Sequence, residues 1–172
     1  VMPSLLFNPV PNNFKFTDSQ KQLKFSNYSK TKLPSNRDEL AFYSVGELAE
    51  LIKTKQISSV ELTKLFLERL KKYDPPLHCV ITLTEERAIE QAKLMDEELA
   101  TGKYRGLLHG IPFGVKDLLA TKDYKTTWGA EPYKEQMINE DAVVIKKLEA
   151  AGGVLVAKLT MGALAWGDVW FG

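Results

Sequence analysis

The chain has 172 residues, enough for one domain. Its residues are 44% hydrophobic and 26% charged, a balance that excludes a fibrous protein and disorder throughout the chain. With 23 basic and 22 acidic residues, the formal net charge is +1, so the composition points to neither a nucleic acid nor a membrane surface as a partner.

Both ends of the sequence suggest a piece of a longer protein. It opens with Val1-Met2-Pro3 and stops at Gly172 within an apolar stretch. The first ten residues do not look like a complete secretory signal, and we expect a cytoplasmic location. A single cysteine, Cys79, excludes an intrachain disulfide, and the two histidines lack a third ligand at metal spacing, so we expect no metal site.

The first 40 residues differ in composition from the rest. They hold four prolines and five asparagines, and they carry six basic against three acidic side chains without a sustained apolar period. This composition is typical of a solvated, irregular segment. We therefore divide the chain into an irregular N-terminal arm, residues 1–40, and part of a domain, residues 41–172.

From residue 44 the chain shows regular helix signals. Ser44-Val45-Gly46-Glu47 is a capping box, in which a serine and a glutamate satisfy each other's free backbone N–H groups, and residues 58–61 repeat it. The second helix should stop at Asp74-Pro75-Pro76. The β-branched residues 78–83 predict a strand, and a helix should follow from Thr84 to residue 101.

The second half of the chain alternates helix and strand signals. Residues 104–117 hold three glycines and a proline around a short apolar core, which favours tight turns. Asn139-Glu140-Asp141 should open a helix that ends at Gly152-Gly153, before a buried strand at residues 154–158 and a short helix at 160–166. The pattern predicts an α/β fold with helices packed on a mixed sheet, whose edge is left exposed.

Lys116 is the candidate catalytic residue. It closes the apolar stretch 111–115 immediately before Asp117. A lysine held at a strand end and partly desolvated can lose its charge near neutral pH, and the neutral amine can then act as a general base toward a hydroxyl. On the residues alone, the alternative is a surface lysine paired with Asp117.

Four blocks carry a resemblance to a known family. They are residues 108–117 (LHGIPFGVKD), 126–129 (TTWG), 141–152 (DAVVIKKLEAAG) and 154–158 (VLVAK). In order and spacing they resemble the amidase signature family, over about residues 44–172. The resemblance implies hydrolysis of a small-molecule carboxylic amide by a serine nucleophile, a second serine with a cis peptide bond, and a lysine base, here Lys116. It implies no metal and no organic cofactor.

The resemblance also implies that the machinery is incomplete here. The last serine is Ser59, whereas the two family serines lie in a glycine- and serine-rich stretch beyond the equivalent of Gly172. The chain should therefore need the remainder of its own polypeptide as a partner, and alone it should be inactive. Nucleic acid and membrane are not expected partners, and the oligomeric state, a homo-oligomer included, stays open.

Departures from the family pattern bear on the subclass. Ala157-Lys158-Leu159-Thr160-Met161 stands where many members read Gly-Lys-Thr-Asn-Met, which favours a free-standing amidase over the tRNA-dependent amidotransferase subunit. A non-catalytic interaction or scaffold protein with the same fold is a further alternative. Lys158 is interpreted as structural, and Thr126, Thr127 and Trp128 either lie near the substrate cleft or pack internally.

Overall fold

The fold is described from a computed structural model, in which residues 13–15, 26–167 and 169–171 are described. Their elements follow one another as η2 (Arg37–Phe42), α1 (Val45–Lys53), α2 (Ser59–Leu77), β1 (Val80–Leu83), α3 (Glu85–Ala100), β2 (Pro112–Lys116), η3 (Glu131–Tyr133), α4 (Val143–Ala150), β3 (Val154–Leu159) and η4 (Ala163–Ala165), where η marks a 3-10 helix. None of the helices in these ranges is both long and apolar enough to cross a bilayer.

The three strands form one mixed sheet in the order β1-β3-β2. The central strand β3 pairs antiparallel with β1 and parallel with β2. Residues 154–158 of β3 are buried, as expected for an apolar run in the middle of a sheet. The predicted α/β fold with a mixed sheet is confirmed, and within the described chain β1 and β2 are the edge strands.

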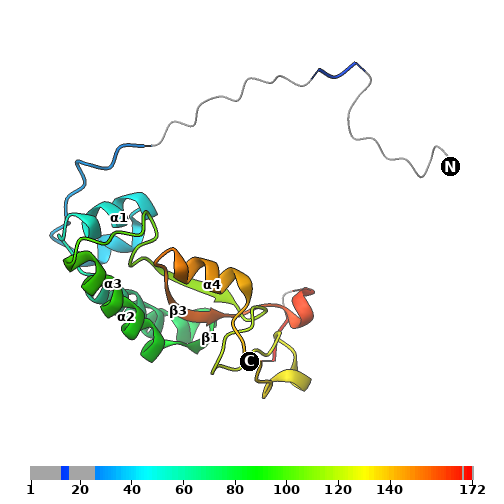
Figure 1. Cartoon of the computed structure of the whole chain (residues 1–172). Coiled ribbons are helices and arrows are strands. Elements are labelled where there is room, and N and C mark those ends of the chain that lie inside the picture. The colour runs from blue at the N-terminus through cyan, green and yellow to red at the C-terminus, as the bar shows by residue number, and fades with distance from the viewer. Residues whose placement is uncertain (1–12, 16–25, 168, 172) are drawn as a thin grey trace.

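Helices cover both faces of the sheet (Figure 1). On one face, α3 packs its small residues Ala88 and Ala92 against Val154 and Val156 of β3. On the other face, Ile145 of α4 joins a separate cluster with residues of β2 and β3. The sheet therefore lies between helical layers.

The two predicted capping boxes are confirmed. Ser44 and Ser58 each accept a hydrogen bond from the backbone N–H three residues ahead, while the glutamate at that position accepts from the serine N–H. Asp96 of α3 also accepts from the N–H groups of Ser59 and Val60, at 2.7 and 3.1 Å. A carboxylate at a helix N-terminus is stabilising, so this contact ties α3 to the start of α2.

The predicted end of the second helix is wrong by about one turn. The helix α2 runs to Leu77 and includes Pro75 and Pro76. The two prolines remove only two hydrogen bonds in an exposed last turn, which a helix end tolerates better than its interior. The Asp74 carboxylate then accepts from the N–H groups of Cys79 and Val80, so the strand begins at Val80 rather than at residue 78.

Helix α4 starts later than the sequence suggested. It begins at Val143 and has no side-chain cap, because Asp141 instead forms bonds with Arg87 and with the N–H of Lys122. The predicted helix at residues 160–166 is only the short η4, and Leu164 within it has a positive φ of 53°. Helix α3 starts directly after Thr84, as predicted. The Thr84 hydroxyl, however, donates to the Leu155 carbonyl across the sheet and does not cap the helix.

Part of the N-terminal arm, residues 1–12 and 16–25, lies outside the described residues. Between residues 26 and 40 the chain makes specific contacts with the helices. The N–H of Leu33 donates to Gln56 at 3.0 Å, and the side chain of Leu40 is fully buried in the cluster formed with α1. The boundary that we set at residue 40 falls within η2.

Candidate functional site

Lys116 is the last residue of β2, and its side chain is exposed. The described part of the chain offers its ammonium neither a hydrogen bond nor an ion pair. We expected this lysine to be partly buried, but the described residues leave it exposed. The reason is that β2 is an edge strand, and no described residue covers that side of its end. A free ammonium at this position is available to a new partner.

The next residue, Asp117, is completely buried, and its backbone and one carboxylate oxygen form hydrogen bonds. Its N–H donates to the Leu159 carbonyl at 2.9 Å, which extends the pairing between β2 and β3 by one residue. Its Oδ2 accepts from the N–H of Thr127 at 2.8 Å and from the Thr127 hydroxyl. These bonds hold the end of β2 to β3 and to the turn that begins at Thr126.

Lys158 of β3 supplies the charge that balances Asp117. Its Nζ lies 2.7 Å from Asp117 Oδ1 in an ion pair in which both side chains have no exposed surface. Oδ1 accepts no hydrogen bond beyond this ionic contact. The same ammonium donates to Thr126 Oγ1 at 2.6 Å and to the Lys125 carbonyl. Burial lowers the pKa of Lys158, against the opposing effect of Asp117.

The structure corrects one point in the sequence interpretation of Lys116, which is the partner of Asp117. The alternative that paired it with Lys116 is wrong, since the carboxylate binds Lys158. The structural interpretation of Lys158 fits its contacts, but its partner was missed. The available signal was the apolar run 154–157 ending in a lysine, because a buried charge requires a counter-charge.

Thr126, Thr127, Trp128 and Gly129 form a tight turn beside this pair. Both threonine side chains are buried and bonded to Lys158 or Asp117. Trp128 and Gly129 have positive φ angles of 52° and 66°, and a Cβ on Gly129 would lie 2.3 Å from the Met161 carbonyl oxygen. Of the two roles considered for these residues, the threonines have the internal one; a role near a substrate stays a prediction.

Ser59 lies at the opposite end of β2 from Lys116. Its buried hydroxyl donates to the Gly110 carbonyl at 3.1 Å, ahead of the first residue of the strand. At about 3.3 Å per residue of extended chain, Gly110 and Lys116 are roughly 15–20 Å apart. The last serine of the sequence therefore cannot exchange a proton with Lys116.

His109 is occupied within the core. Its Nδ1 accepts from the N–H of Arg105 at 3.2 Å, and its Nε2 lies 2.9 Å from the Met95 carbonyl oxygen, which requires a proton on Nε2. The described residues contain no group of three or more histidine, cysteine, aspartate or glutamate side chains that could hold a metal ion.

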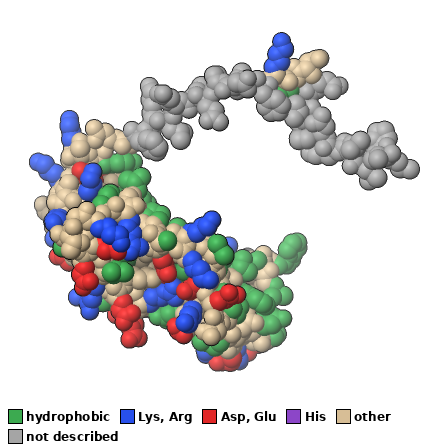
Figure 2. All heavy atoms as spheres, viewed as in Figure 1, with side chains coloured by type: hydrophobic (Ala, Val, Ile, Leu, Met, Phe, Trp, Pro, Cys, Tyr) green, Lys and Arg blue, Asp and Glu red, His purple; other side chains and the backbone are tan. Residues whose placement is uncertain are grey.

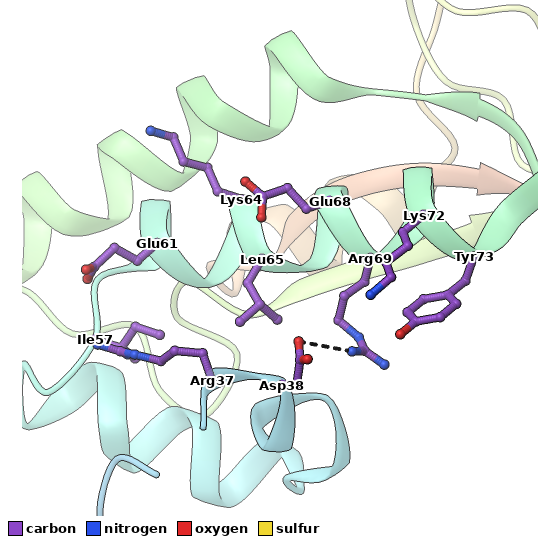
Figure 3. A pocket seen from close by; sticks show the side chains of 10 residues that line it. All are labelled: Arg37, Asp38, Ile57, Glu61, Lys64, Leu65, Glu68, Arg69, Lys72 and Tyr73. Carbon is purple, nitrogen blue, oxygen red and sulfur yellow. Dashed lines mark ion pairs between the residues drawn. The ribbon is translucent and has the colours of Figure 1, made fainter. Parts of the chain in front are cut away.

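A groove of about 480 Å³ lies between η2 and α2, away from Lys116 (Figure 3). Leu65 and Ile57 contribute its apolar part, and an ion pair of 3.5 Å between Asp38 and Arg69 crosses it. On the face drawn in Figure 2, acidic and basic side chains are interspersed, while apolar side chains gather at the end where Figure 1 shows η4. Leu164 within η4 and Trp166 directly after it are exposed.

Comparison with known proteins identifies the class. The family model described as Amidase matches residues 61–168, more than half of the chain. The chain therefore belongs to the amidase family, as the four sequence blocks predicted. Its relatives include both subclasses that we considered.

The chain is 37% identical over 126 residues to the putative amidase AmiD of Mycobacterium bovis. It is 41% identical over 125 residues to the glutamyl-tRNA(Gln) amidotransferase (A-type subunit) of Coxiella burnetii. Each match covers 73% of this chain and 26% of the relative. The chain thus spans about a quarter of the length of these relatives.

Solved amidase structures share the fold. The native peptide amidase of Stenotrophomonas maltophilia matches 72% of this chain with a TM-score of 0.67 and 29% identity, over 26% of its own length. A fatty acid amide hydrolase matches 75% of this chain with a TM-score of 0.68 and 28% identity, over 23% of its length. These matches agree with helices packed on a mixed sheet.

Proposed function

We propose that this chain supplies the base-bearing segment of an amide hydrolase that works by a Ser–cis-Ser–Lys mechanism, with Lys116 as the base. The observation that carries the proposal is the division of roles between two lysines at one strand end. The ammonium of Lys158 has three acceptors around it and no exposed surface, so it cannot accept a proton from a serine. Lys116 is exposed and unpaired within the described residues, which leaves it able to bind a hydroxyl.

In the proposed reaction, Lys116 takes a proton from the bridging serine, which takes one from the nucleophilic serine. The nucleophile attacks the carbonyl carbon of the amide, and the C–N bond breaks as the leaving amine gains a proton. The resulting acyl-enzyme is an ester, which water hydrolyses to the carboxylic acid while the serine regains its proton. Backbone N–H groups near the nucleophile stabilise the oxyanion. The substrate class is a small-molecule carboxylic amide.

We propose that both serines come from outside this chain, as the resemblance to the family implies. Among its later serines, Ser44 and Ser58 serve as helix caps and Ser59 is buried at the far end of β2. A missing nucleophile removes the chemistry outright, so the chain alone should be inactive.

A serine-directed fluorophosphonate probe tests this part of the proposal. The isolated chain should remain unlabelled, and its Ser59→Ala variant should give the same background. An amidase polypeptide that contains this chain together with the serine-bearing segment should be labelled. Labelling of the isolated chain that disappears in Ser59→Ala would contradict the proposal.

The relative with 41% identity supports a second candidate, an ammonia-transferring component of a complex that modifies aminoacyl-tRNA. The two candidates differ in their requirement for further protein chains. Amide hydrolysis by the single polypeptide favours the free-standing amidase, whereas activity only with the other chains of a complex and a charged tRNA favours the amidotransferase. If neither reaction occurs and the probe does not react, the scaffold alternative holds.

A further inference from the structure

Two lysines and one aspartate meet where β2 ends, but only one ion pair forms. The Asp117 carboxylate binds Lys158 at 2.7 Å although Lys116 is its immediate neighbour in sequence. Consecutive residues of a strand point to opposite faces of the sheet. This alternation agrees with the burial of Asp117 and the exposure of Lys116.

The buried pair also determines the local backbone. Asp117 binds β3 through its N–H and binds the turn through its carbonyl oxygen, which accepts from the N–H of Trp128 at 3.3 Å, as well as through its carboxylate. Lys158 binds the turn at Thr126 and at the Lys125 carbonyl. The peptide that joins Lys116 to Asp117 is therefore held by β3 and by the turn.

We propose that Asp117 and Lys158 are positioning residues for Lys116: their buried ion pair fixes the end of β2 and withholds the aspartate charge from the Lys116 ammonium. An unbalanced carboxylate next to a lysine favours the charged ammonium and so leaves less of the neutral amine that acts as the base. With Lys158 in place, the pair is neutral as a whole. This inference rests on the proposed function only where it concerns catalysis.

Other charged groups on the neighbouring segments are few. The Lys125 ammonium is half-exposed and forms its own 2.6 Å ion pair with Glu135. The titratable side chains on the strand end and the loop packed against the pair are Lys116, Lys122, Asp123, Tyr124 and Lys125. Lys125→Met is therefore a matched control, because it removes a lysine next to the turn and keeps the carbonyl that Lys158 uses.

The first test uses the chain itself and needs no activity. Acetic anhydride at a fixed pH of about 7.5 modifies neutral amines, and mass spectrometry gives the rate at Lys116 relative to exposed Lys147. In Lys158→Met the unbalanced Asp117 charge should slow modification of Lys116 by about 2.5-fold, the effect of a unit charge across roughly 8 Å of water. Lys158→Met combined with Asp117→Asn should restore the parent rate.

A purely structural role predicts a different pattern. Loss of the pair would then lower thermal stability in the variants without a selective, reversible change at Lys116. An unchanged Lys116 rate in Lys158→Met, or a slowed rate that the double variant fails to restore, would overturn the inference. If Lys158→Met does not fold, Lys158→Arg and the double variant are compared instead. Both variants should keep the parent rate of Lys116 modification. Selective slowing in either one would overturn the inference.

The second test uses the amidase polypeptide that contains this chain. Lys158→Met should move the acid limb of the pH profile of kcat/KM to higher pH, and the double variant should move it back. Failure of this inference can be distinguished from failure of the proposed function. Turnover retained in Lys116→Ala refutes the function, whereas turnover lost there with an unmoved profile in Lys158→Met refutes the inference.

Discussion

Arg87 of α3 and Asp141, which lies just before α4, form a two-bond pair, with guanidinium nitrogens 3.0 and 2.9 Å from the two carboxylate oxygens. The same arginine donates to Glu149 at the other end of α4, at 2.7 and 3.0 Å. A single side chain of α3 therefore holds both ends of α4. Burial raises the pKa of Asp141, but the bonds from Arg87 and Lys122 outweigh it and lower the pKa below its usual value.

Asp141→Asn should destabilise the chain by about 1 kcal/mol, because the pair is only partly shielded from solvent. Chemical denaturation of the variant measures this loss. Glu140→Gln is the matched control, since Glu140 is exposed and should give a free energy of unfolding within 0.5 kcal/mol or so of the parent. Equal effects of the two substitutions would contradict the role given to Arg87.

Acid should weaken the contact between the end of α3 and the following loop. Hydrogen bonds from Arg105, and then from Lys103, lower the pKa of Glu98 to about 2. A carboxyl group with a lowered pKa stabilises the fold above its ordinary pKa of 4.5, and this contribution is lost as the pH falls toward 2. The Tm difference between the parent and Glu98→Gln should therefore shrink between about pH 5 and pH 2.

The neighbouring Glu97 gives the control for this pH dependence. Its side chain is exposed, and Glu97→Gln should follow the parent curve. A Tm difference between parent and Glu98→Gln that stays constant over the same pH range would show that the Glu98 contact carries no linkage to folding.

Gly129→Ala should be among the most damaging single substitutions in the turn. Its φ of +66° is unfavourable for alanine, and the new Cβ would lie 2.3 Å from a backbone oxygen that cannot rotate away. We expect a loss of about 3 kcal/mol or more in the free energy of unfolding. Gly102→Ala separates the two causes, because Gly102 has a φ of +88° but nothing within 4 Å, and it should cost only about 1 kcal/mol.

Local signals in the sequence were sufficient for the starts of α1 and α2 and for the central strand. The capping boxes at Ser44 and Ser58 involve residues three positions apart, so the pattern alone predicts their hydrogen bonds. The start of α4 was misjudged because Asp141 binds Arg87, 54 residues away, rather than the nearby helix N–H groups. Sequence spacing contains no information on such a partner.

The candidate site was only partly predictable for the same reason. The block that ends in Lys116 and Asp117 marked the place, and β2 ends there as expected. The counter-ion of Asp117 is determined by the parallel register that sets Lys116 opposite Leu159 and so brings Lys158 alongside. A lysine buried in a central strand becomes intelligible only when the pairing of strands is known.

Lys116→Ala in the amidase polypeptide that contains this chain tests the proposed base most directly. The variant should fold with an unchanged Tm, because the side chain is exposed, and it should lose amide hydrolysis by at least about 100-fold, the usual contribution of a positioned general base. Lys147→Ala, at an exposed lysine of α4, should keep full activity. Amide turnover by a folded Lys116→Ala variant at the parent rate would contradict the assignment.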